Sequence, residues 1–448
     1  MAIRGTPMRS IFFVAAAILL AGCMSPALPP ESTPVAWTQF GLGDEPDLIA
    51  RVLLEGQPGC PSITVDGVTT TMRERRDGRS GLYGAMCEER LKLDTALHVR
   101  IAFGSSVILD QNVTRDPRTV AVLGDTGCRI TSFFDQGCGN PATWPFAQVA
   151  DSVARQSPSL ILHLGDYYYR EAPCKGSNED CVRAPYGDRP ETWRAEFFGP
   201  ARKLMAKAPW VFVRGNHEDC MRGGYGWTYY FGDDRKACEV VYDPSVVRLA
   251  GLTVVNVDSA HADDKYAVVP VNQKWKSIAD TVASKVAGTA GPVLLTTHVA
   301  PYFVCPKSCD KGGVADIGGV RVIEEALRAS GRQTILLAGH LHTFQALDAP
   351  GGLSQVIVGN GGANLDPFPK GTVPPPVIDF TFTDWRRTGD KWQSTVDNGR
   401  VVGRAQLWGS VFGFGMLTSS TLQLEMYDAA GQRQFGCSLA GEATPRCR

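Results

Sequence analysis

Short apolar, β-branched runs alternate with amphipathic segments from Arg118 onward, and this alternation limits the fold more than any other feature. It is typical of α/β domains, in which helices cover a largely parallel sheet. The expected strands are Thr119–Leu123, Leu160–Leu164, Trp210–Val213, Leu252–Val257, Val293–Thr297, Thr334–Ala338 and Gln355–Val358. The expected helices are Pro145–Gln156, Glu191–Lys207, Asn272–Val286 and Val320–Ser330.

The segments on either side of this region have a different pattern. Residues 36–117 contain short alternating runs separated by Gly, Pro and Asp, namely Leu48–Leu54, Ser62–Thr70 and Ala96–Phe103. The tail contains strand-like runs at Val401–Trp408 and Thr421–Tyr427. We therefore predict a small β domain over 36–117, an α/β domain over 118–370 and a β-rich extension of it over 371–448.

The first residues have the organisation of an export signal. Arg4 and Arg9 precede an apolar run of ten residues, Ile11–Leu20, which is too short to span a bilayer. The sequence Leu20-Ala21-Gly22-Cys23 resembles the bacterial lipobox, which implies removal of residues 1–22, acylation of Cys23 and a tether over 23–35. Several acyl chains would anchor the protein to a bacterial membrane, facing the periplasm. The alternative is an ordinary secretory signal in which Cys23 is incidental.

The charge balance limits the possible partners. The chain has 45 basic and 46 acidic residues, so it lacks the basic surface that binding to a nucleic-acid polymer requires. A small-molecule substrate remains compatible with this composition. The sequence does not indicate an oligomeric state.

The cysteines fit an exported protein. Apart from Cys23 they form an even set of twelve, in a compartment where disulfides persist. Their clustering favours pairing between neighbours, although a sequence alone does not fix the connectivity. A zinc site built from cysteines is the alternative, but paired CxxC spacing is missing. The disulfide candidates are Cys60, Cys87, Cys128, Cys138, Cys174, Cys181, Cys220, Cys238, Cys305, Cys309, Cys437 and Cys447.

Polar residues follow five of the expected strands. The crevice beyond the carboxyl ends of strands is where open α/β sheets bind ligands, so these loops can converge although they span more than two hundred residues. Four of the seven histidines lie in them. The loops contain Gly124-Asp125-Thr126-Gly127, Gly165-Asp166-Tyr167-Tyr168-Tyr169, Gly215-Asn216-His217-Glu218, His298 and Gly339-His340-Leu341-His342.

Together these residues predict a metal centre. Each signal alone is common in loops, but His340 and His342 are alternate residues, which project to the same side of an extended segment. Carboxylate, amide, imidazole and phenolate donors suit first-row transition metals rather than calcium.

The order and spacing of these motifs resemble the calcineurin-like metallophosphoesterase superfamily. Its pattern is Asp-x-His, Gly-Asp, Gly-Asn-His-[Asp/Glu], His and Gly-His-x-His, and the match extends from Ala121 to Asn364, including the Gly-rich segment Val358–Gly362. The resemblance implies a four-layer αββα sandwich, preceded here by the small β domain. It also implies hydrolysis of phosphate esters at a dinuclear metal centre.

The first motif departs from the common pattern. Gly127 stands where most members have a metal-binding histidine, and Tyr169 follows Asp166 by three residues. These two changes together resemble the purple acid phosphatase branch, in which a tyrosinate on Fe(III) replaces that histidine. Tyr167 and Tyr168 are neighbours of similar chemistry, so the choice of Tyr169 depends on the family spacing.

The resemblance also implies a role for each residue. Asp166 would bridge an Fe(III) ion and a divalent ion, which is Fe, Zn or Mn. Hard anionic donors favour the trivalent ion, and neutral donors suit the divalent one. The first ion would be held by Asp125, Tyr169 and His342, and the second by Asn216, His298 and His340.

Residues beside these ligands have further expected roles. His217 would contact the phosphoryl group and assist the leaving oxygen, with a hydrogen bond that orients a ligand as the alternative. Arg170 is expected to be exposed, with contact to phosphate as the alternative, and His163 is expected to be structural. Glu218 and Asp219 are candidates to orient His217.

The expected function is hydrolysis of phosphomonoesters by metal-bound hydroxide, as in acid phosphatases. A phosphodiesterase or nucleotidase of the same superfamily is the main alternative, because these enzymes share the motifs. An inactive binding lipoprotein on the same fold is a remote alternative, since no expected ligand is missing.

Overall fold

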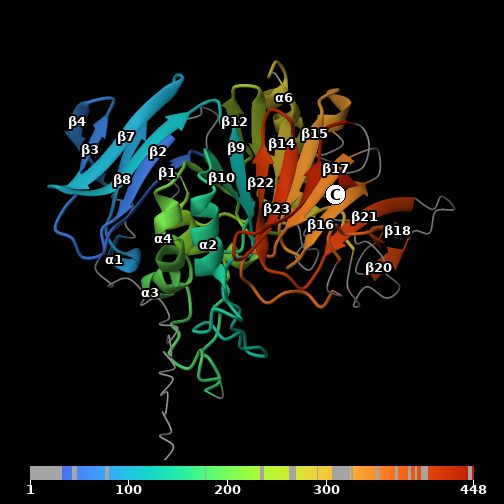
Figure 1. Ribbon diagram of the computed structural model, residues 1–448, viewed down its shortest axis with the longest axis horizontal. Coiled ribbons are helices and arrows are strands. Elements are labelled where there is room, and N and C mark those ends of the chain that lie inside the picture. The colour runs from blue at the N-terminus through green and yellow to red at the C-terminus, as the bar shows by residue number, and fades with distance from the viewer. Residues whose placement is uncertain are drawn as a thin grey trace, which may run out of the picture.

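The computed structural model consists mainly of two large sheets that lie face to face, with helices on their outer faces (Figure 1). It describes residues 33–42, 48–75, 80–176, 178–232, 237–261, 269–289, 291–304, 323, 326–349, 353–368, 372–381, 385–388, 391–394, 402–441 and 446–448.

The first sheet joins strands from both ends of the chain to the centre of the α/β region. Its eleven described strands are, in spatial order, β25 (Arg446–Cys447), β24 (Arg433–Ser438), β23 (Gln423–Asp428), β22 (Gly413–Thr418), β9 (Thr119–Leu123), β10 (Leu160–His163), β11 (Trp210–Phe212), β1 (Val35–Phe40), β2 (Leu48–Leu53), β6 (Met86–Leu91) and β5 (Arg73–Glu74).

The second large sheet contains the later strands of the α/β region. Its eight described strands are, in spatial order, β12 (Ser245–Leu249), β13 (Leu252–Asn256), β14 (Val293–Thr296), β15 (Thr334–Ala338), β17 (Leu353–Val358), β16 (Phe344–Ala349), β21 (Val402–Trp408) and β18 (Val377–Thr381). Two smaller sheets comprise β4 (Val68–Thr71), β3 (Ser62–Val65), β7 (Ala96–Phe103) and β8 (Ser106–Thr114), and the pair β19 (Trp385–Thr388) and β20 (Lys391–Ser394).

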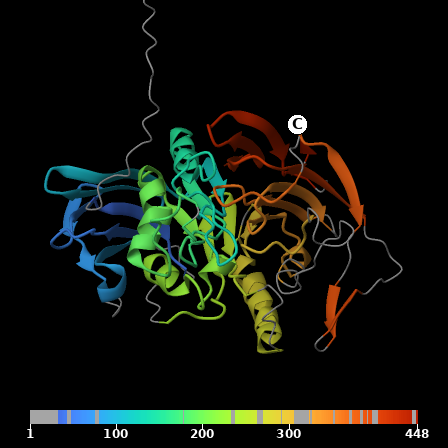
Figure 2. The same cartoon turned by 90° about the horizontal axis from the view of Figure 1, so that it is seen from below.

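Helices cover both outer faces, and Figure 2 shows α2 and α6 on opposite sides of the sheets. The helices are α1 (Ser80–Tyr83), α2 (Phe146–Arg155), α3 (Pro190–Trp193), a π-helical turn (Arg194–Phe198), α4 (Gly199–Met205), a 3-10 turn (Asn216–Glu218), α5 (Gly224–Tyr230) and α6 (Val269–Val286).

The alternation of side chains along each strand produces the layers. On β9, Val122 lies in the core between the two sheets, and Leu123 lies in the core under α2 and α4. On β14, Leu294 lies in the core between the sheets, and Leu295 packs in the core that contains α6. The order of layers is therefore helix, sheet, sheet, helix, and the predicted four-layer αββα fold is confirmed.

The predicted strands of the α/β region are present, with their ends shifted by at most two residues. Of the predicted helix Val320–Ser330, residues 323 and 326–330 are described; residues 323 and 326–329 are helical, and Ser330 lies in a turn. The alternating run Ser62–Thr70 forms two strands. It is a hairpin of β3 and β4, because Asp66 and Gly67 both have positive φ, 47° and 87°, and turn the chain.

The amino-terminal strands continue the first sheet. β1 pairs with β11 in parallel and with β2 in antiparallel fashion, and β6 and β5 follow at the edge. The sheet of β4, β3, β7 and β8 packs on these strands through a shared core that includes Val52, Val99 and Val113. The domain boundaries at residues 117 and 370 remain predictions.

A buried arginine joins these strands to the α/β region. The Arg51 side chain has no exposed surface, forms an ion pair with Glu88 at 2.7 Å, and donates to the carbonyl oxygens of Tyr230 and Gly232, each at 2.7 Å. Arg51 thus holds the end of α5 against β2.

Five disulfides connect neighbouring cysteines, as predicted. The bonds are Cys60–Cys87, Cys128–Cys138, Cys174–Cys181, Cys220–Cys238 and Cys437–Cys447. This number of disulfides is typical of an exported protein in an oxidising environment. Cys23, Cys305 and Cys309 lie outside the described residues. Among the described helices, none combines the length and apolar character needed to cross a bilayer.

The Arg51–Glu88 pair generates a prediction about stability. Burial opposes ionisation of Glu88, but Arg51 and Arg75 outweigh it and lower its pKa below the ordinary value of 4.5. Since Glu88→Gln leaves Arg51 buried without its counter-ion, we expect a loss of about 3 kcal/mol of unfolding free energy in urea at pH 7. Because the pKa of Glu88 is lowered in the folded protein, its carboxylate stabilises the fold above pH 4.5, and this contribution is lost as the pH falls further. The difference in unfolding free energy between the wild type and Glu88→Gln should therefore shrink below pH 4.5.

The control variant is Glu89→Gln. Glu89 is the next residue, and its ion pair with Arg73 is 3.5 Å long and leaves the Arg73 side chain 84% exposed. We expect a change of about 0.5 kcal/mol or less. Equal effects of the two variants would contradict the assigned role of Arg51 and Glu88.

Candidate metal centre

Loops from both large sheets converge on one buried site. Asp125, Asp166 and Asn216 follow the parallel strands β9, β10 and β11 of the first sheet. His298 follows β14 of the second sheet, and His340 and His342 follow its neighbour β15. Since parallel strands end at the same edge of a sheet, the order of strands brings these residues together.

The first group of donors surrounds the phenol oxygen of Tyr169. Tyr169 Oη lies 2.5 Å from Asp166 Oδ2, 2.7 Å from His342 Nε2 and 3.2 Å from Asp125 Oδ1. His342 Nε2 also lies 3.5 Å from Asp125 Oδ1. These are the four residues expected around the first ion.

The second group of donors surrounds the amide oxygen of Asn216. Asn216 Oδ1 lies 2.8 Å from His298 Nε2 and 3.0 Å from His340 Nδ1. His298 Nε2 lies 3.2 Å from Asp166 Oδ2, the same oxygen that contacts Tyr169. Asp166 therefore contacts both groups.

Hydrogen bonds outside the site orient two of the histidines. His298 Nδ1 donates to the carbonyl oxygen of Leu164 at 2.7 Å, and His342 Nδ1 donates to that of Asn364 at 2.6 Å. In the neutral rings Nε2 then carries a lone pair directed at other acceptor atoms. Acceptors that face one another in this way fit a cation between them.

The charges of the site also fit a cation. Burial raises the pKa of the Asp125 carboxyl, whereas His298 and His217 overcome burial and hold the pKa of Asp166 well below its usual range. Burial lowers the pKa of His298, but Asp166 outweighs this and raises it to about 9. A bound metal ion would replace that proton as the partner of Asp166.

Metal binding also depends on the protonation of His340 and Tyr169. Burial and the charge of His298 lower the pKa of His340 to about 3, so this ring is neutral and able to donate its lone pair. Burial and the carboxylates of Asp166 and Asp125 raise the pKa of Tyr169 well above its usual value. This phenol ionises only if a strong cation binds beside it.

The backbone is strained at three of these residues. Asp125, Asp166 and His340 have φ of 55°, 59° and 73°, in the left-handed region that L-residues rarely adopt. Such conformations persist only where the surrounding structure enforces them, and they cluster at functional sites.

Gly127 and Tyr169 depend on each other. A Cβ atom added at Gly127 would lie 2.7 Å from Tyr169 Cδ2 and 2.8 Å from both Glu196 Oε1 and the carbonyl oxygen of Tyr167. The Tyr169 ring thus fills the space that a histidine at 127 would need.

Of the three successive tyrosines, Tyr169 is the one whose oxygen reaches the site. Tyr167 donates to the carbonyl oxygen of Val213 and stacks on His163, and Tyr168 stacks on Trp193. His163 is buried and contacts Thr126 Oγ1 at 2.9 Å, which agrees with a structural role.

Two buried glutamates connect the loops of the site. Glu218 accepts four backbone N–H groups, from Asp166, Tyr167, Tyr168 and Gly215, and so joins the loops after β10 and β11. Glu196, in the π-helical turn, accepts the N–H groups of Cys128 and Tyr169. Burial raises the pKa of Glu196 to about 8 although Arg170 opposes this shift.

His217 lies beside the two groups of donors, and its ring centre is 4.0 Å from that of Tyr169. Its backbone N–H donates to Asp166 Oδ1 at 3.0 Å, and its Nδ1 lies 2.7 Å from Glu171 Oε1. The carboxylate of Glu171 therefore fixes the proton on Nδ1 and leaves Nε2 without a hydrogen-bond partner among the described residues. Glu218 and Asp219 do not orient this ring, because Glu218 binds backbone groups and Asp219 binds Arg222.

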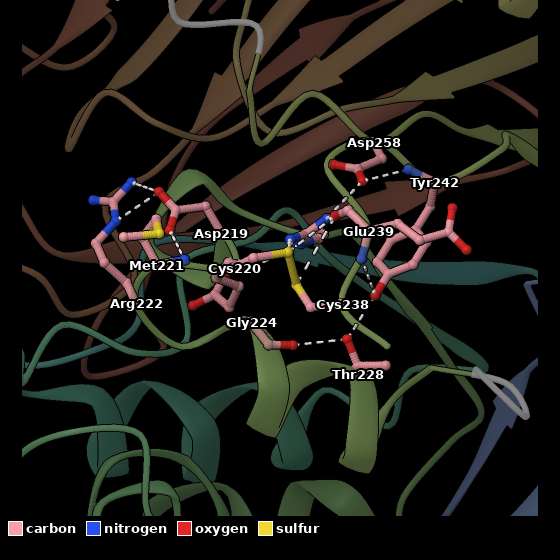
Figure 3. Close-up of a disulfide and its surroundings, with 12 residues drawn as sticks. Asp219, Cys220, Met221, Arg222, Gly224, Thr228, Cys238, Glu239, Tyr242 and Asp258 are labelled. Atoms are coloured by element: carbon pink, nitrogen blue, oxygen red, sulfur yellow. Dashed lines mark hydrogen bonds and ion pairs between the residues drawn. A yellow bond between two sulfur atoms is a disulfide. The ribbon is translucent and has the colours of Figure 1, made fainter. Parts of the chain in front are cut away.

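The loop that contains Asn216 and His217 is fixed at its far side by a disulfide (Figure 3). Cys220 and Cys238 are bonded, and Asp219 forms an ion pair with Arg222 at 2.7 Å. The buried Arg214 donates to the carbonyl oxygen of Glu218 at 2.7 Å and to Asp258 Oδ2 at 3.0 Å. These contacts hold both ends of the loop.

Several residues of the site were not predicted from the sequence. Ser259 Oγ accepts the N–H groups of His298 and Val299, and Asp366 accepts that of His342. Ser259 follows β13, so the rule that polar residues at strand ends build the site would have found it. The only sequence signal for Glu171 is its position two residues after Tyr169.

The expectation that Arg170 is exposed is wrong. Arg170 is 3% exposed, and its guanidinium lies 5.2 Å from the centre of the Trp144 ring. A bridge between Ile130 and Arg170 draws this residue inward, where burial lowers the pKa of its guanidinium although Glu196 opposes this shift.

Comparison with known proteins identifies the family. Residues 118–344 match the family model described as calcineurin-like phosphoesterase, so the chain belongs to this family and is a metal-dependent hydrolase by class. Membership of this family, which the motifs predicted, is therefore confirmed.

Solved structures share the fold at low sequence identity. The purple acid phosphatase PPD1 from yellow lupin (Lupinus luteus) seeds is 13% identical with a TM-score of 0.54, and the alignment covers 90% of this chain and 73% of that one. PhoD is 11% identical, also with a TM-score of 0.54, and the alignment covers 92% and 91%. The comparison with curated protein sequences gave no match.

The close approach at Gly127 generates a prediction. In Gly127→Ala, the new methyl group has to displace the Tyr169 ring or the backbone of Tyr167, so we expect a loss of about 1–3 kcal/mol in urea unfolding. In a Tyr169→Ala background the ring contact is absent, and the same substitution should cost less. Equal costs in both backgrounds would show that the two positions are not coupled.

Proposed function

We propose that the chain is a dinuclear metal-dependent phosphomonoesterase of the acid phosphatase type, related to the purple acid phosphatase branch. The observation that carries this proposal is the position of Tyr169 Oη, which lies within 3.2 Å of Asp125, Asp166 and His342. A phenolate with carboxylates is a hard, anionic donor set suited to Fe(III).

The donor groups form two sets, which we assign to two metal ions of different charge. Asp125, Tyr169 and His342 would hold Fe(III), Asn216, His298 and His340 would hold a divalent ion, and Asp166 would contact both. When bound, the two ions lower the pKa of a water molecule and neutralise charge on the phosphoryl oxygens. Neutral amide and imidazole donors at the second position suit Fe, Zn or Mn as the divalent ion.

His217 is the proposed catalytic residue outside the metal ligands. Its Nδ1–H is held by Glu171 at 2.7 Å, and in the doubly protonated ring the Nε2–H would contact the phosphoryl group and pass its proton to the leaving oxygen, which leaves the neutral ring hydrogen-bonded to Glu171. The side chain is 13% exposed, so a substrate can reach it. Glu171 is a positioning residue, because it acts through His217.

The amino-terminal features complete the proposal. Cleavage before Cys23 and acylation of this cysteine would place the enzyme on a bacterial membrane, facing the periplasm. The five disulfides and the export signal support export, and the lipobox-like sequence supports the anchor. The substrate would then be a small phosphate ester of that compartment.

The test uses a soluble form that lacks residues 1–23. Metal analysis should give two ions per chain, and assays of a panel of esters should show faster hydrolysis of phosphomonoesters than of phosphodiesters. His217→Ala should lower kcat roughly 100-fold or more at unchanged metal content, because the residue moves a proton and holds no metal.

Other outcomes would change the proposal in different ways. Preferred hydrolysis of diesters would establish the phosphodiesterase or nucleotidase alternative. A protein that binds two ions and hydrolyses none of the esters would refute the enzymatic function. Loss of metal in His217→Ala would assign this histidine a structural role.

A further inference from the structure

The side chain of Arg222 joins the turn that contains His217 to the segment that contains Glu171. Arg222 Nη1 lies 3.4 Å from Glu171 Oε1, and the same oxygen lies 2.7 Å from His217 Nδ1. The guanidinium and the imidazole therefore share one carboxylate oxygen. Within the described part of the chain, the Glu171 carboxylate has no third hydrogen-bond or ion-pair partner.

The guanidinium of Arg222 is itself held in place. Its Nε and Nη2 donate to Asp219 Oδ2 at 2.9 and 2.7 Å, as Figure 3 shows. Nη2 also donates to the carbonyl oxygen of Asn216. Because Asp219 and Asn216 hold one side of the planar group, they set the direction in which Nη1 points toward Glu171.

The backbone between His217 and Arg222 forms a closed turn. The N–H of Arg222 donates to the carbonyl oxygen of Asp219 at 3.0 Å, and the N–H of Gly223 donates to that of His217 at 3.0 Å. The Cys220–Cys238 disulfide ties this turn to a later segment of the chain. The distance from Arg222 to His217 is therefore fixed by the local fold.

The His217 ring has neighbours on two sides. Its centre lies 4.0 Å from that of the Tyr169 ring, and its Nδ1 contacts Glu171. The side chains of His217, Glu171 and Arg222 are 13%, 24% and 27% exposed, so solvent screens their charges only in part. A carboxylate with a second charged partner has less freedom to rotate, and it orients the ring that it binds more firmly.

We infer that Arg222 is a positioning residue, which fixes the Glu171 carboxylate and, through it, the orientation of the His217 ring toward the leaving oxygen. This inference rests on the proposed function. General acid catalysis requires the donor nitrogen to lie within hydrogen-bond distance of the oxygen that it protonates, so a ring that turns more freely transfers its proton less often. Arg222 itself binds Asp219, Asn216 and Glu171 and acts only through His217.

The first test varies the leaving group. Glycerol 3-phosphate releases an alkoxide that needs a proton, whereas p-nitrophenyl phosphate releases a phenolate that leaves with little protonation. Arg222→Gln should therefore lower kcat roughly 10-fold or more for glycerol 3-phosphate and less than about 3-fold for p-nitrophenyl phosphate, at unchanged KM and metal content. Arg222→Lys should restore part of the rate, because it keeps the charge beside Glu171.

The second test asks whether Arg222 acts through His217. In a His217→Ala background, Arg222→Gln should have no further effect on kcat for glycerol 3-phosphate, because the group that it positions is absent. Equal losses in the two backgrounds, or equal losses for the two substrates, would show a general structural role for Arg222 and overturn the inference.

The matched control is Arg433→Gln. Arg433 also forms an ion pair, at 2.9 Å to Glu425, but it lies in β24, which β23 and β22 separate from β9. Its kinetic constants should equal those of the wild type. A loss as large as that of Arg222→Gln would also count against the inference.

A measurement without substrate separates this inference from the proposed function. In the zinc-loaded, diamagnetic protein, the His217 Nδ1–H bound to Glu171 should give a downfield proton resonance, which His217→Ala removes and thereby assigns. Arg222→Gln should shift or broaden this resonance, and Arg433→Gln should leave it unchanged. If the protein hydrolyses no ester but the resonance depends on Arg222, the proposed function fails and the positioning of His217 by Arg222 stands. If the resonance is identical in the wild type and Arg222→Gln, the inference is refuted whatever the enzyme hydrolyses.

Discussion

Two carboxylates, those of Asp125 and Asp166, are buried together where the ends of both sheets meet, and this charge determines much of the surrounding structure. Ligand atoms of these residues and of His298 lie within 4.8 Å of one another. Buried charges of the same sign require compensation, which imidazoles and N–H groups supply here and which the two proposed metal ions would complete. The surrounding structure enforces the strained backbone at Asp125 and Asp166. Glu218, for example, accepts the backbone N–H of Asp166.

The proposed ligand Tyr169 has consequences for the packing around it. The Tyr169 ring occupies the volume beside position 127, so only glycine fits there. The buried Glu196 then connects the backbone of Tyr169 with that of Cys128, and the Cys128–Cys138 disulfide closes the loop that contains Arg129. The tyrosine, the glycine, the buried glutamate and the closed loop therefore form one structural unit.

Much of this could be predicted from the sequence because the signals are local. Strand ends with Gly-Asp, Asn-His and His-x-His place the donors in order, and β-branched runs such as Thr334–Ala338 define their strands. Longer-range features could not be predicted. β1 pairs with β11 through Gln39 and Trp210, Arg51 contacts Tyr230, which is 179 residues away, and the partner of His217 is Glu171, 46 residues away. The Asp66-Gly67 turn is a local signal, whereas the burial of Arg170 depends on Glu196 and Trp144, which the sequence does not connect with it.

The most direct test of the central claim is the visible absorption spectrum of the iron-loaded protein. A tyrosinate on Fe(III) gives a charge-transfer band, so the wild-type protein should be coloured and Tyr169→Phe should lose or shift the band. Tyr168→Phe is the matched control, because that ring stacks on Trp193 and should leave the band unchanged. A protein that binds iron without colour, or a band that Tyr169→Phe leaves intact, would contradict the assignment of Tyr169 to the ferric site.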